Sequence, residues 1–399
     1  MSAGASLSRA GTLERRYLSG TFAELCRIES PSCRERACAQ LVIAELRGLG
    51  LEVHEDGAAA AIGGDCGNLL ARIPAGPGGQ LGIGEQPARS VLLCTHLDTV
   101  PLAAPVEPVL VDGFWENAND GILGADNKAA VAVVLALARH IRQEGAPVDV
   151  ELLFTVGEEI SLAGAGAFDT SVLRSDFGYV FDHASPIGEV VVGSPSHFRV
   201  EISLHGAPAH AGIRPQDGRS AIVAAGRAVA AMPTGRLDDG TTVNLGTISG
   251  GSAINVVAEH CSLVAEVRGM DDERAEAVLA EIIDRVHEAA NMPDCDCDVD
   301  IDVQRTFTGY RVAPGSEPVR VAEAALRACG HEPVRISSGG GSDANALIAA
   351  GMQTVNLANG TERNHEPGER VGVAALEEML DVALALLDEA AATAADAGQ

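Results

Sequence analysis

The stretch Val91-Leu-Leu-Cys-Thr-His96-Leu-Asp98-Thr-Val-Pro101 is an apolar run that ends in a histidine and an aspartate. Alternation along an extended chain places His96 and Asp98 on the same side, and Pro101 limits further strand pairing. Asp98 can then accept a hydrogen bond from the ring nitrogen that does not bind metal, which fixes the imidazole tautomer. A core histidine beside a turn-forming aspartate would give the same pattern, so this stretch indicates a metal site only together with others.

A second apolar run, residues 150–156, is followed by the adjacent acidic residues Glu158 and Glu159. If the chain stays extended, the two side chains point in different directions, so that one could bind a metal while the other faces a water molecule. The alternative is a solvated acidic pair that opens a surface turn. Two divalent ions need about five or more side-chain ligands from several strand ends, so further clusters decide the question.

Three further residues supply such ligands. Asp126 precedes a helical pattern, where it is either an N-cap or a carboxylate that bridges two ions about 3.5 to 4 Å apart. Asp182 follows the apolar residues 177–181, with His183 as an alternative ligand there. His365 lies in a polar loop after a late apolar strand and offers a second imidazole.

Around these motifs, the pattern predicts two domains. Helical and strand-like segments alternate up to about residue 192 and again from about residue 307, which is typical of an α/β sheet with functional loops at the carboxyl ends of its strands. Between them the predicted order is βαββαβ, a ferredoxin-like unit. We therefore expect a discontinuous catalytic domain, residues 1–193 and 307–399, interrupted by an inserted domain, residues 194–306.

Composition narrows the class of protein. The chain has 399 residues and a net charge of -28, which argues against binding to nucleic acid or an anionic membrane. Its nine cysteines form no CxxC pair, which disfavours a disulfide framework and suits a reducing compartment. Cys295 and Cys297 are expected to pack inward, a soft-metal site being the alternative.

The N-terminus lacks the pattern of a signal peptide, and the longest apolar run, residues 129–138, is far short of the roughly 20 residues that span a bilayer. We therefore predict a cytoplasmic protein. Residues 74–87, rich in glycine and proline, are predicted to form a surface loop.

Taken together, the motifs resemble the aminoacylase, carboxypeptidase G and peptidase T group of co-catalytic dizinc hydrolases, and most of all its peptidase T-like members. The resemblance runs from about residue 13 to residue 387 in one order. Its quoted segments are Thr95-His-Leu-Asp-Thr-Val-Pro101, Gly124-Ala-Asp-Asn-Lys128, Gly157-Glu-Glu159, Phe181-Asp182, Gly206-Ala-Pro-Ala-His-Ala-Gly212, Gly339-Gly-Gly-Ser-Asp-Ala-Asn345 and His365.

The resemblance implies a zinc exopeptidase-like catalytic domain of mixed α/β sheet that holds two divalent metal ions bridged by Asp126. The ligands of one ion would be His96 and Asp182, and those of the other Glu159 and His365. Zinc is the expected metal, and cobalt or manganese would also suit these ligands. Asn127 and Ala130 depart from the residues that relatives often have, a second acid and a glycine, but neither departure removes a ligand.

The same resemblance assigns further roles. Asp98 would orient a ligand histidine, and Glu158 would be the general base for a metal-bound hydroxide that attacks the amide carbon. The inserted domain would be a lid and dimerisation domain, from which His210 reaches the partner subunit's active site and helps hold the oxyanion. Asn255 and Arg268 match positions that face the substrate, with Arg268 suited to clamp a carboxylate, although a solvated arginine is the alternative.

The function expected from this resemblance is an aminopeptidase, active as a homodimer, that cleaves short peptides such as tripeptides. An N-acyl-amino-acid amidohydrolase, a carboxypeptidase or a dipeptidase would use the same metal chemistry, so the substrate is a small peptide or an N-acyl amino acid. A non-catalytic binding protein on the same fold is a remote alternative. Fold alone does not decide among them.

Overall fold

A computed structural model describes residues 7, 9–76 and 89–397, which divide into two compact units. The first unit contains the chain up to Val192, together with Arg311–Ser338 and Ser342–Gln399, and the second contains Gly193–Tyr310 and Gly339–Gly341. Most of the loop predicted at residues 74–87 lies outside the described residues. Among the described helices, none is both long and apolar enough to cross a membrane.

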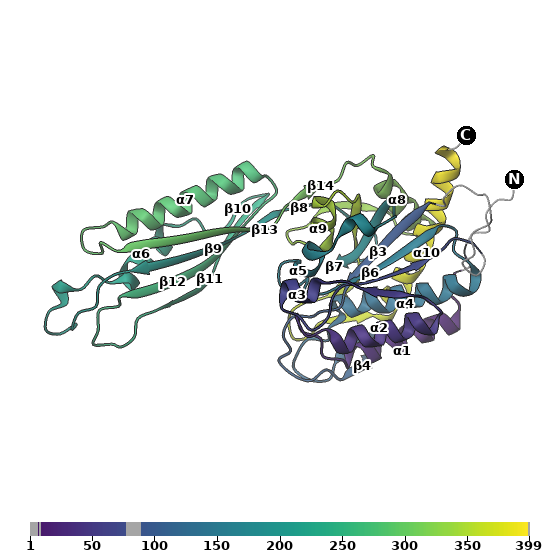
Figure 1. The fold of residues 1–399 in the computed structure, drawn as a ribbon, viewed down its shortest axis with the longest axis horizontal. Helices are drawn as coiled ribbons and strands as arrows, with labels where there is room; N and C mark the ends of the chain where they lie inside the picture. The colour runs from purple at the N-terminus through teal and green to yellow at the C-terminus, as the bar shows by residue number, and fades with distance from the viewer. Residues whose placement is uncertain (1–6, 8, 77–88, 398–399) are drawn as a thin grey trace. The chain divides into compact units, whose positions relative to one another are not determined.

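The first unit is built on a nine-stranded mixed sheet in the order β1-β2-β6-β3-β7-β16-β8-β14, with β15 paired to β8 (Figure 1). Its central neighbours β6, β3, β7 and β16 run parallel, so their carboxyl ends meet at one edge. The strands are β1 (Val53–Glu55), β2 (Leu69–Ile73), β3 (Ser90–His96), β6 (Asp149–Thr155), β7 (Phe177–His183), β8 (Glu189–Ser194), β14 (Tyr310–Arg311), β15 (Val334–Ser337) and β16 (Thr354–Ala358).

Helices cover this sheet. The long helix α4 is apolar along most of its length and almost entirely buried, because it packs against β3 and β7 as well as α1 and α10. Figure 1 shows α1, α2 and α4 stacked on the same side of β3 and β6. The helices of this unit are α1 (Thr12–Cys26), α2 (Arg36–Gly48), α3 (Ala58–Ile62), α4 (Ala125–Glu144), α5 (Ala163–Ala167), α8 (Glu317–Ala328), α9 (Asp343–Ala349) and α10 (Val373–Ala397).

A small four-stranded antiparallel sheet, which the sequence did not predict, contacts α4 and α10. Its order is β17 (Thr361–Glu362), β18 (Arg370–Gly372), β5 (Phe114–Asn117) and β4 (Pro108–Val111). Because β17 and β18 flank the polar loop that contains His365, their pairing holds both ends of that loop.

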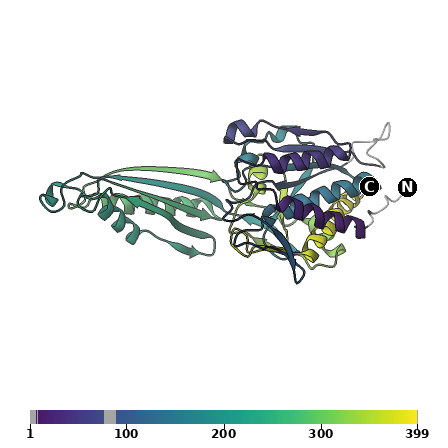
Figure 2. The same cartoon turned by 90° about the horizontal axis from the view of Figure 1, so that it is seen from below.

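The second unit has the predicted βαββαβ order. Its strands form one antiparallel sheet in the order β10-β11-β12-β9-β13, and α6 and α7 lie on one face of it (Figures 1 and 2). The unpredicted edge strand β10 makes the sheet five-stranded. The elements are β9 (Ser196–His205), α6 (Ala221–Ala231), β10 (Gly235–Asp238), β11 (Thr241–Gly250), β12 (His260–Gly269), α7 (Asp272–Ala290) and β13 (Asp298–Phe307).

Alternate residues of β9, including Val200, Ile202 and Leu204, face α6 and α7 and form a separate core. Cys295 and Cys297 are buried in this core, which confirms that they pack inward. All nine cysteines are free thiols, as expected without a disulfide framework.

Candidate metal centre

Apart from Asp126, the predicted metal ligands of the first unit and the predicted base Glu158 come from the carboxyl ends of its four parallel strands. His96 ends β3, Glu158 and Glu159 follow β6, Asp182 lies at the end of β7, and His365 follows β16. In a parallel sheet these ends share one edge, where binding sites of α/β proteins form. The fold therefore brings residues far apart in the sequence to one place.

Asp126 lies between the two imidazoles. Its Oδ1 is 3.3 Å from His96 Nε2, and its Oδ2 is 3.1 Å from His365 Nε2. Gly124, with φ +76°, turns the chain just before α4, and the backbone of Asp126 itself is not helical, which leaves its carboxylate free of the helix. Each oxygen thus faces a different nitrogen ligand, the arrangement that a bridging carboxylate requires.

The remaining carboxylates complete two groups. His96, Asp126 and Glu159 each offer a ligand atom within 4.8 Å of the others, and so do His96, Glu158 and Asp182. Glu159 Oε1 is 2.9 Å from His365 Nε2, and Asp182 Oδ1 is 3.5 Å from His96 Nε2. Of the seven residues predicted at this edge, all but Asp98 therefore belong to one of these groups or, like His365, contact a member of one.

Asp98 contacts more than the imidazole of His96. His96 Nδ1 lies 3.0 Å from the backbone oxygen of Asp98 and 3.4 Å from its carboxylate, so the carbonyl is the nearer acceptor. The carboxylate accepts hydrogen bonds from the backbone N–H groups of Glu158 and Glu159, both at 3.0 Å, and from the Ser32 hydroxyl at 2.7 Å. Asp98 therefore fixes the backbone of the acidic pair as well as the imidazole.

The chain is not extended at Glu158 and Glu159, although their predicted divergence assumed an extended chain. Gly157 has φ +60°, a left-handed conformation that favours glycine, and it turns the chain after β6. The divergence of Glu158 and Glu159 therefore arises from a turn. Sequence alternation could not reveal this turn.

Two buried acids at the site had no assigned role in the sequence analysis. The Glu369 carboxylate accepts backbone hydrogen bonds from Leu123 at 2.8 Å, Gly124 at 2.7 Å and Asp126 at 2.8 Å. Asp343, at the start of α9, accepts a hydrogen bond from the Thr155 hydroxyl. Asp343 lies within the quoted segment 339–345, and Glu369 follows His365 in the same polar loop. Residue type alone did not indicate that either acid would be buried.

The cluster is short of positive charge. Burial raises the pKa of Asp182 to about 8 and the pKa of Glu158 well above its usual range. The hydrogen bonds to Asp126 and then Glu159 raise the pKa of His365 to about 10. Burial alone would lower the pKa of His96, but neighbouring carboxylates raise it. Several buried carboxylates with few positive groups beside them give a site suited to cations, and its oxygen and nitrogen donors fit two divalent ions.

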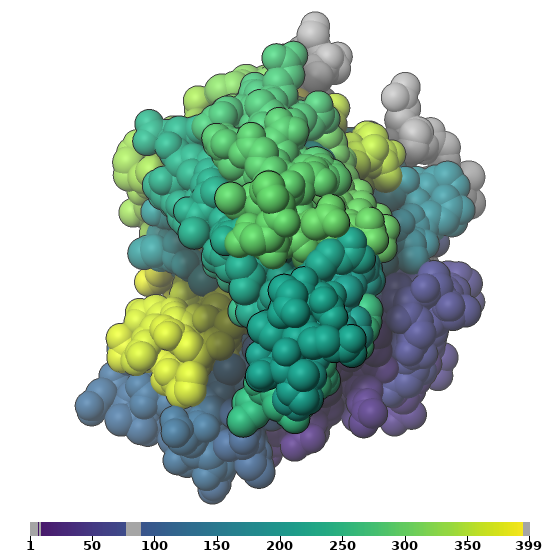
Figure 3. Space-filling model, turned by 90° about the vertical axis from the view of Figure 1, so that its left-hand side faces the viewer, coloured from purple at the N-terminus to yellow at the C-terminus, as the bar shows by residue number. Residues whose placement is uncertain are grey.

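His210, Asn255 and Arg268 belong to the second unit. His210 is exposed, its Nδ1 accepts a hydrogen bond from Gly212 N–H at 3.2 Å, and the backbone oxygen of Asn255 accepts from Ala211 N–H at 3.0 Å. This loop, residues 206–219, lies at the front of the face in Figure 3, in teal.

Arg268 is already paired in the structure. Its Nε and Nη2 lie 3.1 and 3.2 Å from the two carboxylate oxygens of Glu266, and Nη1 is 3.5 Å from the carbonyl of Gly339. His197 Nε2 also contacts Glu266, at 3.0 Å. Arg268 would have to exchange the Glu266 carboxylate for that of a substrate.

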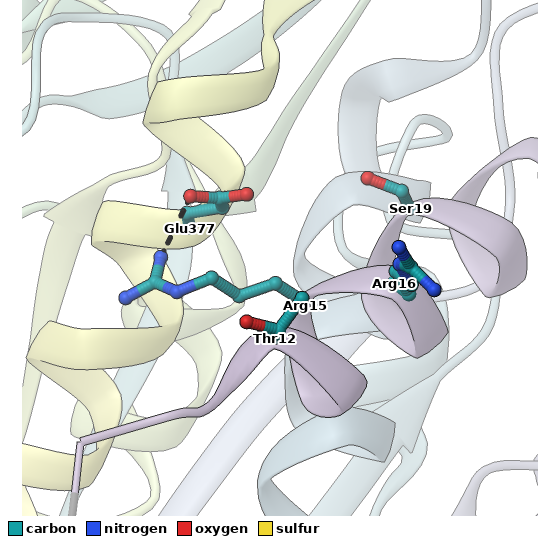
Figure 4. A pocket seen from close by; sticks show the side chains of 5 residues that line it. All are labelled: Thr12, Arg15, Arg16, Ser19 and Glu377. Carbon is teal, nitrogen blue, oxygen red and sulfur yellow. Dashed lines mark hydrogen bonds and ion pairs between the residues drawn. The ribbon is translucent and has the colours of Figure 1, made fainter.

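A pocket of about 300 Å³ lies elsewhere on the first unit, and no predicted site residue lines it (Figure 4). Its lining residues are Thr12, Arg15, Arg16, Ser19 and Glu377. Arg15 forms ion pairs with Glu377 at 2.8 Å and Asp381 at 2.7 Å, so its charge is neutralised within the protein.

Two profiles of peptidase families match parts of this chain. The profile "Peptidase dimerisation domain" matches residues 192–291, and the profile "Peptidase family M28" matches residues 79–183. The chain is 31% identical over 379 residues to the uncharacterized protein YqjE of Bacillus subtilis, covering 95% of this chain and 99% of that protein.

Two solved structures are similar over nearly the whole chain. The aminopeptidase PepT of Bacillus cereus has a TM-score of 0.82 and 33% identity, covering 94% of this chain and 99% of its own. A tripeptidase of Staphylococcus aureus has a TM-score of 0.86 and 30% identity, covering 95% and 99%. The chain belongs to the M20 peptidases, among the peptidase T-like members, which confirms the predicted family, fold class and hydrolytic activity on peptide bonds.

Proposed function

We propose that this protein is a two-metal aminopeptidase that hydrolyses short peptides such as tripeptides. The observation that carries the proposal is the position of Asp126, whose two oxygens face His96 and His365 separately. His96 and Asp182 would hold one ion, and Glu159 and His365 the other. The similarity to an aminopeptidase and a tripeptidase supports cleavage at the amino end.

Two divalent ions, for which zinc is our choice, would polarise the amide carbonyl and lower the pKa of a water molecule towards about 7. Glu158 would take a proton from that water as it attacks and return the proton to the leaving nitrogen, the usual work of a general base and acid. Asp98 holds Glu158 in place through its backbone N–H. Exposed His210 would donate to the oxyanion from a partner subunit.

A homodimer and a cytoplasmic location belong to this proposal. The match of residues 192–291 to a peptidase dimerisation domain supports the dimer, as do exposed apolar residues of the second unit such as Ile213, Ile248 and Ile254. The free cysteines support a reducing compartment. Analytical ultracentrifugation of the purified protein would test the dimer directly.

The substrate is tested with the zinc-loaded protein and one tripeptide in three forms: free, N-acetylated and C-amidated. We expect cleavage to require the free amine and to release the first residue. Preference for the acetylated form would overturn the aminopeptidase assignment in favour of a carboxypeptidase or an N-acyl-amino-acid amidohydrolase. No cleavage of any form with two metals bound would contradict peptide hydrolysis itself.

A further inference from the structure

A second group of possible metal ligands lies outside the centre described above, where α2 begins. Glu35, Asp65 and Cys66 each offer a ligand atom within 4.8 Å of the others. The two ligand groups of the metal centre contain only imidazole and carboxylate donors, whereas this group contains sulfur. It therefore has a different metal preference, because thiolate ligands select softer ions.

Glu35 is the least ordinary member of the group. Its side chain is fully buried, and its Oε1 accepts backbone hydrogen bonds from Cys33 at 2.9 Å and Gly157 at 3.0 Å. Its Oε2 is also buried but has no hydrogen-bond partner. A buried carboxylate oxygen without a partner is costly, so a ligand at this position would relieve an existing penalty.

The other two members make the position reachable and give it a soft donor. Asp65 is exposed, and its Oδ1 accepts the backbone N–H of Arg36 at 3.0 Å. Cys66 is fully buried beside it. The cluster is thus open to solvent on the side of Asp65 and closed on the side of the sulfur.

Nearby positive charge does not block the position. The guanidinium of Arg36 binds both carboxylate oxygens of Glu55, at 2.8 and 2.5 Å, and donates to the backbone oxygen of Asp65 at 2.8 and 3.1 Å. Its charge is therefore matched by Glu55, so Arg36 does not neutralise the carboxylate of Asp65 beside the thiol.

We propose that Glu35, Asp65 and Cys66 form a third cation site, which takes one thiophilic divalent ion such as Zn²⁺ or Cd²⁺. Glu35 supplies Oε2, Asp65 a carboxylate oxygen and Cys66 its sulfur, which releases its proton to solvent as the metal–sulfur bond forms. Water completes a four-coordinate shell. Oε1 of Glu35 stays bonded to Gly157, so the ion also braces the turn before Glu158.

The probe is Cd²⁺, added to the full-length protein after two equivalents of zinc per chain, enough to fill the metal centre but not a third site. Bonds between thiolate and cadmium absorb in the ultraviolet, whereas imidazole and carboxylate ligands give no such band. We expect the band to saturate at one added ion per chain and to be absent in Cys66→Ser. Cys329→Ser, which removes a half-buried thiol from the end of α8, is the matched control and should keep the band.

Asp65→Asn provides a second variant whose folding is not in question, since the residue is exposed and the amide oxygen can still accept from Arg36 N–H. It should weaken Cd²⁺ binding by about tenfold or more, because a neutral amide oxygen replaces a charged ligand oxygen. Absence of the band in the wild type, its persistence in Cys66→Ser, or unchanged affinity in Asp65→Asn would each overturn the proposal. None of these measurements depends on peptidase activity.

Discussion

At the scale of single residues, Asp98 and Glu369 differ from the proposed metal ligands because their carboxylates accept hydrogen bonds from backbone N–H groups. His96 and Asp182 could be predicted at strand ends, and Asp126 before a helix, because a polar residue at the boundary of an apolar run is a visible pattern. Glu369 accepts hydrogen bonds from backbone N–H groups, and Ser32 donates one to the Asp98 carboxylate. Neither role could be predicted, because residue type alone does not indicate it.

The two glutamates after β6 should separate by function. Glu158→Ala should retain both metal ions but lose about 10²- to 10⁴-fold in turnover, because it removes the proton acceptor. Glu159→Ala should lose one ion, because its carboxylate faces His365 at 2.9 Å. Metal content by mass spectrometry alongside kcat distinguishes them, and the reverse pattern would show that the two roles are exchanged.

Glu369→Gln should weaken the centre without touching a metal ligand. An amide group in place of one carboxylate oxygen leaves at least one of the N–H donors from Leu123, Gly124 or Asp126 without an acceptor, at a cost of about 1 to 3 kcal/mol. We also expect metal affinity to fall by about 10- to 100-fold.

Denaturant unfolding and competition with a chelator measure these two effects. Glu362→Gln is the control, since this residue of the same segment is exposed and pairs with Arg370 at the surface. Equal effects in the two variants would mean that the backbone bonds to Glu369 do not position Asp126.

At the scale of elements, long segments were predictable and short ones were not. The helices and central strands follow clear apolar periods, whereas β17 has two residues and β10 has four, too few for alternation to be seen. These short strands depend on pairing with partners that are distant in sequence, as β18 pairs with β5. The unpredicted small sheet is what holds the loop of His365.

Helix α5 supports the turn before Glu158 through one glycine. A Cβ on Gly164 would lie 1.9 Å from the carbonyl oxygen of Val156, a backbone atom, so Gly164→Ala must displace α5 or the turn. We expect a loss of stability of about 1 to 3 kcal/mol or more, with reduced activity.

Gly166→Ala in the same helix is the matched control. A Cβ there meets nothing within 4 Å, so alanine should be neutral or stabilising by up to about 1 kcal/mol. The two unfolding midpoints test this difference. If both variants matched the wild type, α5 would not be packed as closely as described.

At the scale of the whole molecule, the insertion was predictable because its βαββαβ order is encoded in six long elements. The order of strands in the sheet and the partners of each carboxylate were not, because they depend on contacts between distant segments. The trans role of His210 likewise requires a second chain.

Mixed dimers test this trans role. One subunit carries Asp126→Ala and keeps His210, and the other carries His210→Ala and keeps its metal ligands. If His210 acts in trans, the heterodimer should regain roughly half the activity of a wild-type dimer, although each parent homodimer is nearly inactive. Differently tagged subunits allow the heterodimer to be isolated, and activity no higher than that of the parents would exclude a trans role.

The discontinuity of the first unit has a consequence for how the protein is made. Asp182 leaves the ribosome before the inserted unit and His365 after it, so the chain grows by 183 residues between them (365 − 182). At about 5 to 20 residues per second, the nascent chain carries four of its five proposed ligands for roughly 10 to 40 s. A ribosome-bound chain that ends before His365 should therefore hold metal weakly, so that full loading comes only after synthesis is nearly complete.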